Sequence, residues 1–137
     1  NKELAYYYLK KGDKEKALEN FQIAFDKSPE DFNLIKNVLV LYIDLEKYNE
    51  AEVFSQEALE IYPSQPIFYL ANGVANNNLN RPKDAIDALE LGIDYIIDDK
   101  VMEIDFYKQL SIAYKLMNNI TKANAFDKKV NELLKDE

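Results

Sequence analysis

Apolar and polar residues recur in the second quarter of the chain with the period of an amphipathic helix. Between residues 34 and 42 the apolar positions lie three or four apart, and the same spacing returns between residues 51 and 62. Such spacing puts the apolar side chains on one face of an α-helix. Residues 47–49 include turn formers and interrupt the pattern. This stretch therefore predicts two amphipathic helices joined by a short turn.

The same two-helix pattern returns along the whole chain, with a period of 34 residues between the first units. Four residues of the first unit recur after that shift: Tyr8, Ala17, Ala24 and Pro29 return as Tyr42, Ala51, Ala58 and Pro63. Shifting Ala51 by 34 gives Ala85, and a further shift of 38 gives Ala123. In this register the chain is a single domain of four units: residues 1–31, 32–65, 66–103 and 104–137.

Turn formers and prolines mark the ends of the predicted helices. The other turns are expected at residues 12–13, 76–82 and 118–119. Pro29 and Pro63 end the second helices of the first two units, because proline cannot continue a helix and restricts the residue before it. Pro66 is expected in the first turn of the next helix, with Ser64 or Gln65 as its cap.

These residues and their spacing resemble the tetratricopeptide repeat, a 34-residue helix–turn–helix unit. The first unit carries the family's residues at the family's offsets: Ala5, Tyr8, Gly12-Asp13, Ala17, Phe21, Ala24 and Pro29. The second unit keeps Tyr42, Tyr48, Ala51, Ala58 and Pro63. The resemblance implies an all-α fold, a right-handed α-solenoid of about four helix-turn-helix units with eight helices. It also implies a concave surface lined by the first helix of each unit.

Small and aromatic residues at the repeated positions indicate the core. The repeated alanines are expected where the two helices of a unit cross, because a methyl group permits close approach of the helix axes. They are Ala17, Ala51, Ala85 and Ala123. The repeated tyrosines, Tyr8, Tyr42 and Tyr114, are expected to fill the space between successive helices. Both sets are interpreted as structural.

The third unit departs from the pattern at Asn76, which stands where the other units have tyrosine. Asparagine favours turns, so residues 76–80 predict a longer turn, with a polar pocket facing a ligand as the alternative. The unit also has four extra residues before Val101, about one helical turn. A longer second helix that keeps Ile93, Ile96 and Ile97 in phase is therefore expected.

Charge and composition exclude several classes of function. The 25 acidic and 17 basic residues leave a net charge of −8, which opposes binding to nucleic acid, and His and Cys are absent. Imidazole and thiol catalysis and the usual zinc sites are therefore excluded. The acidic stretch 98–105 lacks the glycine and the alternating spacing of a calcium loop and is interpreted as solvated charge. We expect no enzyme, no cofactor and no bound metal.

The sequence favours no membrane span, because no run of residues approaches the roughly 20 apolar residues that a spanning helix needs. The chain begins inside a predicted helix and without Met, so it is interpreted as a fragment or a processed form. A cytoplasmic location is favoured, and a periplasmic one is possible if a signal segment was removed.

Aligned positions of the first helices predict the binding surface. One column is apolar (Tyr6, Val40, Val74 and Ile112), and the next is rich in lysine (Lys2, Lys36, Leu70 and Lys108). The apolar column either packs against neighbouring helices or forms a peptide groove. The residues expected to contact a peptide in a concave groove are Lys2, Tyr6, Lys36, Asn37, Val40, Asp44, Leu70, Val74, Asn77, Lys108 and Ile112.

The predicted function is a non-catalytic scaffold that binds a peptide segment of a partner protein. The alternative is a structural or self-associating solenoid segment of a larger protein, with a homodimer through the groove or through the terminal helix. Val130, Leu133 and Leu134 give that helix an apolar edge. The carboxylate clamp by which some members of the family hold chaperone tails does not fit, because Ile67 and Ala71 stand where basic residues are needed.

Overall fold

The chain folds into successive pairs of helices in the computed structural model, which describes residues 1–136. Residue 137, the last of the predicted fourth unit, lies outside the described part. Over residues 1–136 there are eight α-helices, one short 3-10 helix and no strand. Their bounds are α1 Lys2–Lys11, α2 Lys14–Lys27, α3 Phe32–Asp44, α4 Tyr48–Ile61, α5 Pro66–Asn78, α6 Pro82–Gly92, η1 Ile93–Tyr95, α7 Lys100–Leu116 and α8 Ile120–Lys135.

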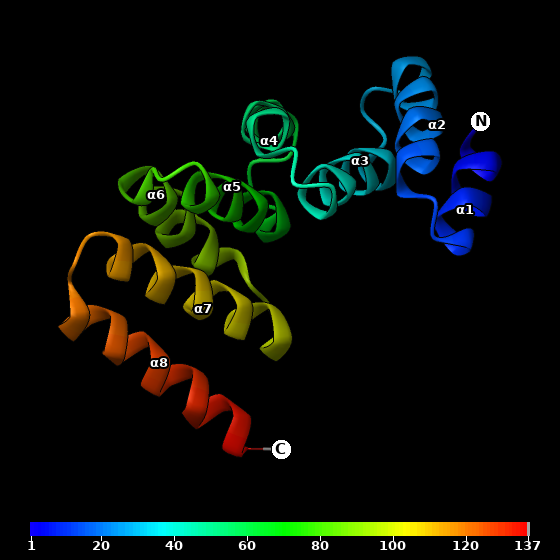
Figure 1. The fold of residues 1–137 in the computed structure, drawn as a ribbon. Helices are drawn as coiled ribbons and strands as arrows, with labels where there is room; N and C mark the ends of the chain where they lie inside the picture. The colour runs from blue at the N-terminus through cyan, green and yellow to red at the C-terminus, as the bar shows by residue number, and fades with distance from the viewer. Residues whose placement is uncertain (137) are drawn as a thin grey trace.

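The helices follow one another in chain order along a curved molecule (Figure 1). The odd-numbered helices α1, α3, α5 and α7 lie along its inner side, and the even-numbered helices α2, α4, α6 and α8 lie along its outer side. Helices α1 and α8 form the two ends. The predicted fold class, an all-α solenoid of helix pairs, is confirmed.

The turn inside each pair has the same backbone geometry. One residue in every turn adopts a left-handed conformation: Gly12 (φ 82°), Glu46 (φ 57°), Asn80 (φ 58°) and Asn118 (φ 60°). The amide of the next residue donates a hydrogen bond, 2.7–2.9 Å long, to the carbonyl five residues earlier. This pairing satisfies a carbonyl at the end of the first helix and is the Schellman arrangement. The predicted turns at residues 12–13 and 118–119 are confirmed, whereas the turn of the second unit lies slightly earlier than predicted, because α4 begins at Tyr48.

Polar side chains begin several of the helices. The side chains of Asp13, Asp31, Asp99 and Asn119 each accept a hydrogen bond, 3.0–3.2 Å long, from the backbone amide three residues later. Such a bond satisfies one of the free amides at a helix N-terminus. Helix α5 begins instead with Pro66 in its first turn after Gln65, as the sequence predicts.

The repeated alanines and aromatic residues form the core. Ala17, Ala51, Ala85 and Ala123 are fully buried, which confirms their place between packed helices. The repeated tyrosines are half-buried, and two of them pair with a phenylalanine of the following helix. The ring centroids of Tyr42 and Phe54 lie 5.8 Å apart, and those of Tyr114 and Phe126 lie 5.8 Å apart in a stacked arrangement. Such pairs stabilise the packing beyond their buried area.

The prediction of a turn at Asn76 is wrong, because α5 continues to Asn78. Asn76 is only 3% exposed. Its Nδ2 donates to the carbonyl and to the Oδ1 of Asn72, one helical turn earlier. Because the Nδ2 finds partners on its own helix, asparagine is tolerated at this buried position.

The prediction of a longer second helix in the third unit is also wrong. Helix α6 ends at Gly92 and is followed by the short helix η1. The chain then leaves the helical path, so Ile97 is 84% exposed. A Cβ on Gly92 would lie 2.2 Å from the Cβ of Tyr69, so the end of α6 approaches α5 too closely for a side chain at this position. The extra residues form the connection to α7, which begins at Lys100, before the predicted unit boundary at 103/104.

Candidate functional site

An apolar groove lies between α3 and α5, two helices of the inner side of the curve (Figure 1). Its volume is about 130 Å³. The groove, called here the α3/α5 groove, is lined by Val40, Ile43, Asp44, Ile67, Leu70, Ala71 and Val74. Apart from Asp44, every lining side chain is aliphatic, so the groove offers contact surface and few hydrogen-bonding groups.

Four of the predicted site residues line this groove: Val40, Asp44, Leu70 and Val74. Val40 is 40% exposed, so this part of the apolar column faces solvent and does not belong to the core. Sequence reasoning missed Ile43 and Ile67 as lining residues. Each lies three residues from a predicted position on the same helix face, which is the signal that would have found them.

The predicted residues near the N-terminus link α1 to α3. The Nδ2 of Asn37 donates to the hydroxyl oxygen of Tyr6 over 3.0 Å. The ring of Tyr6 also packs edge-on against Phe21, with centroids 5.0 Å apart. Lys2 Nζ lies 3.6 Å from Asp31 Oδ2. These residues continue the inner surface, but they do not line the α3/α5 groove.

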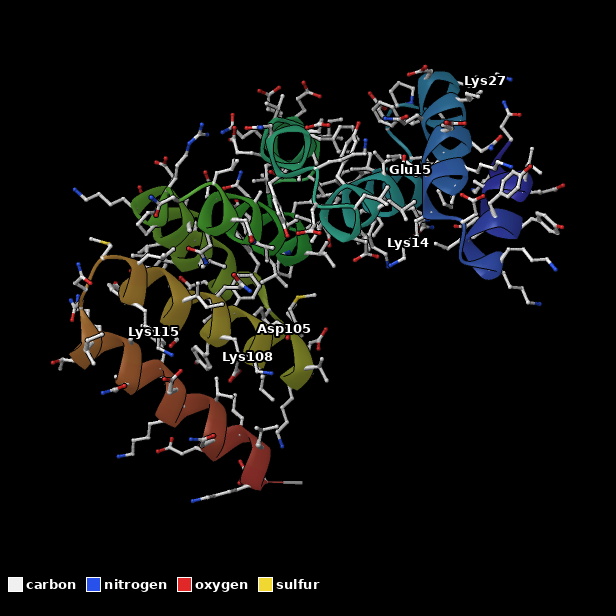
Figure 2. The ribbon with its side chains drawn as sticks, in the orientation of Figure 1. Lys14, Glu15, Lys27, Asp105, Lys108 and Lys115 are labelled. Carbon is white, nitrogen blue, oxygen red and sulfur yellow. The ribbon has the colours of Figure 1, made fainter. Side chains whose placement is uncertain are left out.

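The predicted residues toward the C-terminus have two different settings. Ile112 is 42% exposed on α7, and Figure 2 shows Lys108 on the same helix. Asn77, by contrast, is 7% exposed, and its Nδ2 donates to both the backbone carbonyl and the Oε1 of Gln109 over 3.0 Å. Asn77 therefore ties α5 to α7, and its amide nitrogen is not free for a ligand.

Lysines supply the positive charge at this surface. Asp44, at the edge of the groove, pairs with Lys14 of α2, whose Nζ lies 3.4 Å away; Lys14 is labelled in Figure 2. Lys36 and Lys108 have no carboxylate within 4.0 Å among residues 1–136. The pKa of Asp31 lies below its usual value, because the Leu34 amide donates to it and Lys2 is close. Within the described residues, the inner helices α3 and α7 thus carry lysines without an ion pair, although the chain as a whole is acidic.

No three acidic side chains within residues 1–136 converge in a way that would hold a metal ion. None of the helices in this part of the chain is both long and apolar enough to cross a membrane.

A comparison with protein families matches residues 37–65 to the tetratricopeptide repeat. These residues include α4, part of α3 and the turn between them. The resemblance seen in the sequence is therefore confirmed. A comparison with curated protein sequences gives no significant match.

Solved structures of MamA, a protein of tetratricopeptide repeats, share the fold. MamA from Desulfovibrio magneticus RS-1, residues 41 to the end, has a TM-score of 0.85 and 18% identity over 98% of this chain and 74% of that one. MamA of AMB-1 has a TM-score of 0.83 and 22% identity over 98% of this chain and 77% of that one. MamA of MSR-1 has a TM-score of 0.80 and 22% identity over 97% of this chain and 74% of that one. At these identities the likeness shows the tetratricopeptide-repeat fold.

Proposed function

We propose that this tetratricopeptide-repeat chain is a non-catalytic scaffold that holds a peptide segment of a partner protein in the α3/α5 groove. Solenoids of stacked helix pairs offer extended concave surfaces for binding, and scaffolds of this fold are in general not catalysts. The observation that carries the proposal is the open apolar groove between the inner helices α3 and α5, on a molecule whose inner helices also carry lysines that form no ion pair within residues 1–136.

The lining of the groove indicates which part of a peptide it would hold. Val40, Leu70 and Val74 offer branched apolar side chains, and the volume of about 130 Å³ suits a single apolar side chain. Lys36 or Lys108 would meet a carboxylate of the same peptide, since a charged hydrogen bond adds orientation to the apolar contact. We therefore propose a short segment with one apolar anchor and a nearby acidic group.

Self-association through α8 is the second candidate. Leu134 is 47% exposed on that helix, and Ile120 is also exposed. A second copy could cover this face, as closed dimers commonly do. Light scattering of the purified chain separates the two cases: a monomer that binds peptide supports the scaffold, and a stable dimer that binds no peptide supports self-association.

The experiment that tests the proposed function begins with peptides selected from a random displayed library on the immobilised chain. Their affinity is then measured for the wild type, for Val74→Glu and for Val53→Glu. Val53 is an exposed valine on α4 and serves as the matched control, because it introduces the same charge on the outer side. We expect Val74→Glu to weaken binding at least tenfold, about 1.4 kcal/mol, and Val53→Glu to leave it unchanged.

Two further measurements control for the possibility that Val74→Glu loses binding only because it is unfolded. Thermal unfolding of each variant shows whether the half-buried Val74 tolerates glutamate, and Lys36→Glu provides a variant outside the groove wall. Wild-type affinity in both Val74→Glu and Lys36→Glu would contradict the proposal.

A further inference from the structure

A second, polar pocket is lined by residues of α4, α5 and α6, of which α4 and α6 lie along the outer side of the molecule (Figure 1). Its volume is about 370 Å³. Its wall includes the polar residues Glu52, Asn72, Asn76, Arg81, Asp84 and Asp87. The pocket is separate from the α3/α5 groove, which lies on the inner side.

The pocket differs in chemistry from the equivalent place in the preceding unit. There, the wall of the hollow contains Tyr42 and Phe54, whose rings are in contact, together with polar residues that include Asp26 and Glu57. A shift of 34 residues puts Asn76 and Ala88 at these two positions, and both line the polar pocket. In the fourth unit the aromatic pair is present again, as the stacked rings of Tyr114 and Phe126. The third unit alone among these three exchanges an aromatic wall for amides and a methyl group.

A chain of buried hydrogen bonds fixes which atom of Asn76 faces the pocket. The Oγ of Ser55 donates to the carbonyl of Glu52, so it accepts from the Nδ2 of Asn72 over 2.9 Å. The Oδ1 of Asn72 in turn accepts from the Nδ2 of Asn76 over 2.9 Å. Both side-chain amides are thereby oriented by their partners.

This orientation leaves the Oδ1 of Asn76 as an acceptor at the pocket wall. Asn76 is only 3% exposed, and no donor of residues 1–136 bonds to this oxygen. Within residues 1–136, the Oδ1 of Asn77 is the side-chain oxygen that is both without a partner and fully enclosed. The Oδ1 of Asn76 also lacks a partner but is not fully enclosed, so some of its surface is accessible. This accessible surface faces the pocket, because Asn76 lines it. A nearly buried carbonyl oxygen without a partner is costly in free energy, so a hydrogen-bond donor that enters the pocket and bonds to it is stabilised there.

The charges around this acceptor select a cation. Three carboxylates, of Glu52, Asp84 and Asp87, and one guanidinium, of Arg81, line the pocket, so the wall carries a net charge of 1 − 3 = −2. Arg81 Nη1 lies 4.0 Å from Glu52 Oε1, a long contact. Asp84 and Asp87 have no cation within 4.0 Å among the described residues. A metal ion does not suit the site, because no three acidic groups of residues 1–136 converge.

We propose that this pocket binds the guanidinium group of an arginine side chain from a partner protein. A guanidinium presents several N–H donors in one plane, so it can bond to the Asn76 carbonyl oxygen and to a carboxylate at the same time. It is also more weakly hydrated than an ammonium group, which lowers the cost of entering a half-enclosed pocket. The proposal does not depend on peptide binding in the α3/α5 groove.

The test is a titration of the isotope-labelled chain with N-acetyl-L-arginine methylamide, followed by NMR at the side-chain amides of Asn72 and Asn76. The citrulline analogue has the same shape without the charge and is the control ligand. We expect saturable shifts of these amides with the arginine probe and none with citrulline. Equal shifts with both, or equal affinity for the lysine analogue, would overturn the assignment.

Variants locate the binding. Asp84→Asn with Asp87→Asn removes two exposed charges without disturbing the core, and we expect it to weaken the arginine probe at least tenfold. Asp94→Asn with Asp105→Asn changes the net charge equally, outside the pocket, and should leave the affinity unchanged. Asn76→Leu keeps a similar volume but removes the acceptor, and it should also weaken binding while the chain stays folded by circular dichroism. Wild-type affinity in the doubly substituted pocket variant, or in folded Asn76→Leu, would contradict the proposal.

Discussion

At the scale of single residues, the repeated alanines set how closely paired helices approach. Each of the four is fully buried, and a larger side chain would have to displace the neighbouring helix. Their recurrence in the sequence makes this role predictable, because a small residue at a fixed place in every unit has a packing reason that does not depend on the details of the fold.

Replacing one of these alanines tests that role directly. Ala51→Leu adds three carbon atoms where no space remains, and overpacking of this kind costs about 1–3 kcal/mol. We expect a lower midpoint of thermal unfolding. Ala125→Leu, at an exposed position of α8, makes the same exchange without overpacking and is the matched control. An unchanged midpoint for Ala51→Leu would show that the residue does not lie at a tight crossing.

Asp127 joins α8 to α7 through a buried hydroxyl. The Oγ of Ser111 donates to its Oδ1 over 2.6 Å, and Lys115 Nζ lies 3.3 Å from its Oδ2. The pKa of Asp127 is lowered from 3.8, mainly by the Ser111 hydrogen bond and also by Lys115, while burial opposes the shift. A carboxyl whose folded pKa is depressed stabilises the fold above the pKa of the unfolded chain.

This shift gives a pH-dependent prediction. Asp127→Asn keeps an acceptor for Ser111 but removes the charge, so the wild type should be the more stable protein at neutral pH. The difference should shrink as the pH falls below 3.8 and through the depressed pKa, because the wild-type carboxyl then becomes neutral as well. Urea unfolding at a series of pH values measures it. Asp105→Asn, exposed on α7, is the control, and a difference that grows toward low pH would contradict the account.

At the scale of helices, the four turns inside the pairs share one left-handed residue. The second turn uses Glu46 for this conformation, whereas the others use glycine or asparagine. Left-handed backbone costs a residue with a bulky side chain about 1–2 kcal/mol, and it costs glycine almost nothing. The turn of the second unit therefore carries avoidable strain.

Substitutions at the left-handed residues of the first two turns should change the free energy of unfolding in opposite directions. Glu46→Gly should stabilise the chain by about 0.5–1 kcal/mol, less than the full strain because glycine also gains freedom in the unfolded state. Gly12→Ala should destabilise it by about 1 kcal/mol through the backbone alone, since no atom lies within 4 Å of the added Cβ. Chemical denaturation of both variants checks the pair. Destabilisation by Glu46→Gly would be inconsistent with a strained turn.

The helices that the sequence predicts correctly are those bounded by local signals. Pro66 begins α5, and Gly12 ends α1. The third unit differs from its prediction for reasons that only tertiary packing supplies. Asn76 finds its partner on Asn72, which overrides its preference for turns, and Gly92 lets the end of α6 lie directly against Tyr69 of α5.

At the scale of the whole molecule, the curvature of the stacked helix pairs determines which of the aligned positions of the first helices are exposed on the groove. The sequence identifies Val40 and Val74 because they align in the first helices, and both line the α3/α5 groove. It does not separate these residues from Tyr6, which links α1 to α3, or from Asn77, which bonds to Gln109. The distinction depends on the angles between helices, which a repeat pattern does not contain.

The sequence indicates the polar pocket on the outer side only as the less favoured explanation of Asn76. The second signal is Ala88, which replaces the phenylalanine of the neighbouring units at the paired position. Asn76 and Ala88 replace a tyrosine and a phenylalanine that contact each other in the neighbouring units, and two such replacements together indicate a local change of chemistry. The asparagine alone is equally typical of a turn.

The central claim is that a partner peptide docks on the inner side of the curve, in the α3/α5 groove. The most direct measurement is methyl NMR of the chain with labelled Ile, Leu and Val, titrated with a selected peptide. The account predicts saturable shifts at Val40, Ile43 and Val74, with Val53 and Leu91 on the outer helices unchanged. Shifts confined to the outer helices or to α8, with the groove methyls unmoved, would contradict it.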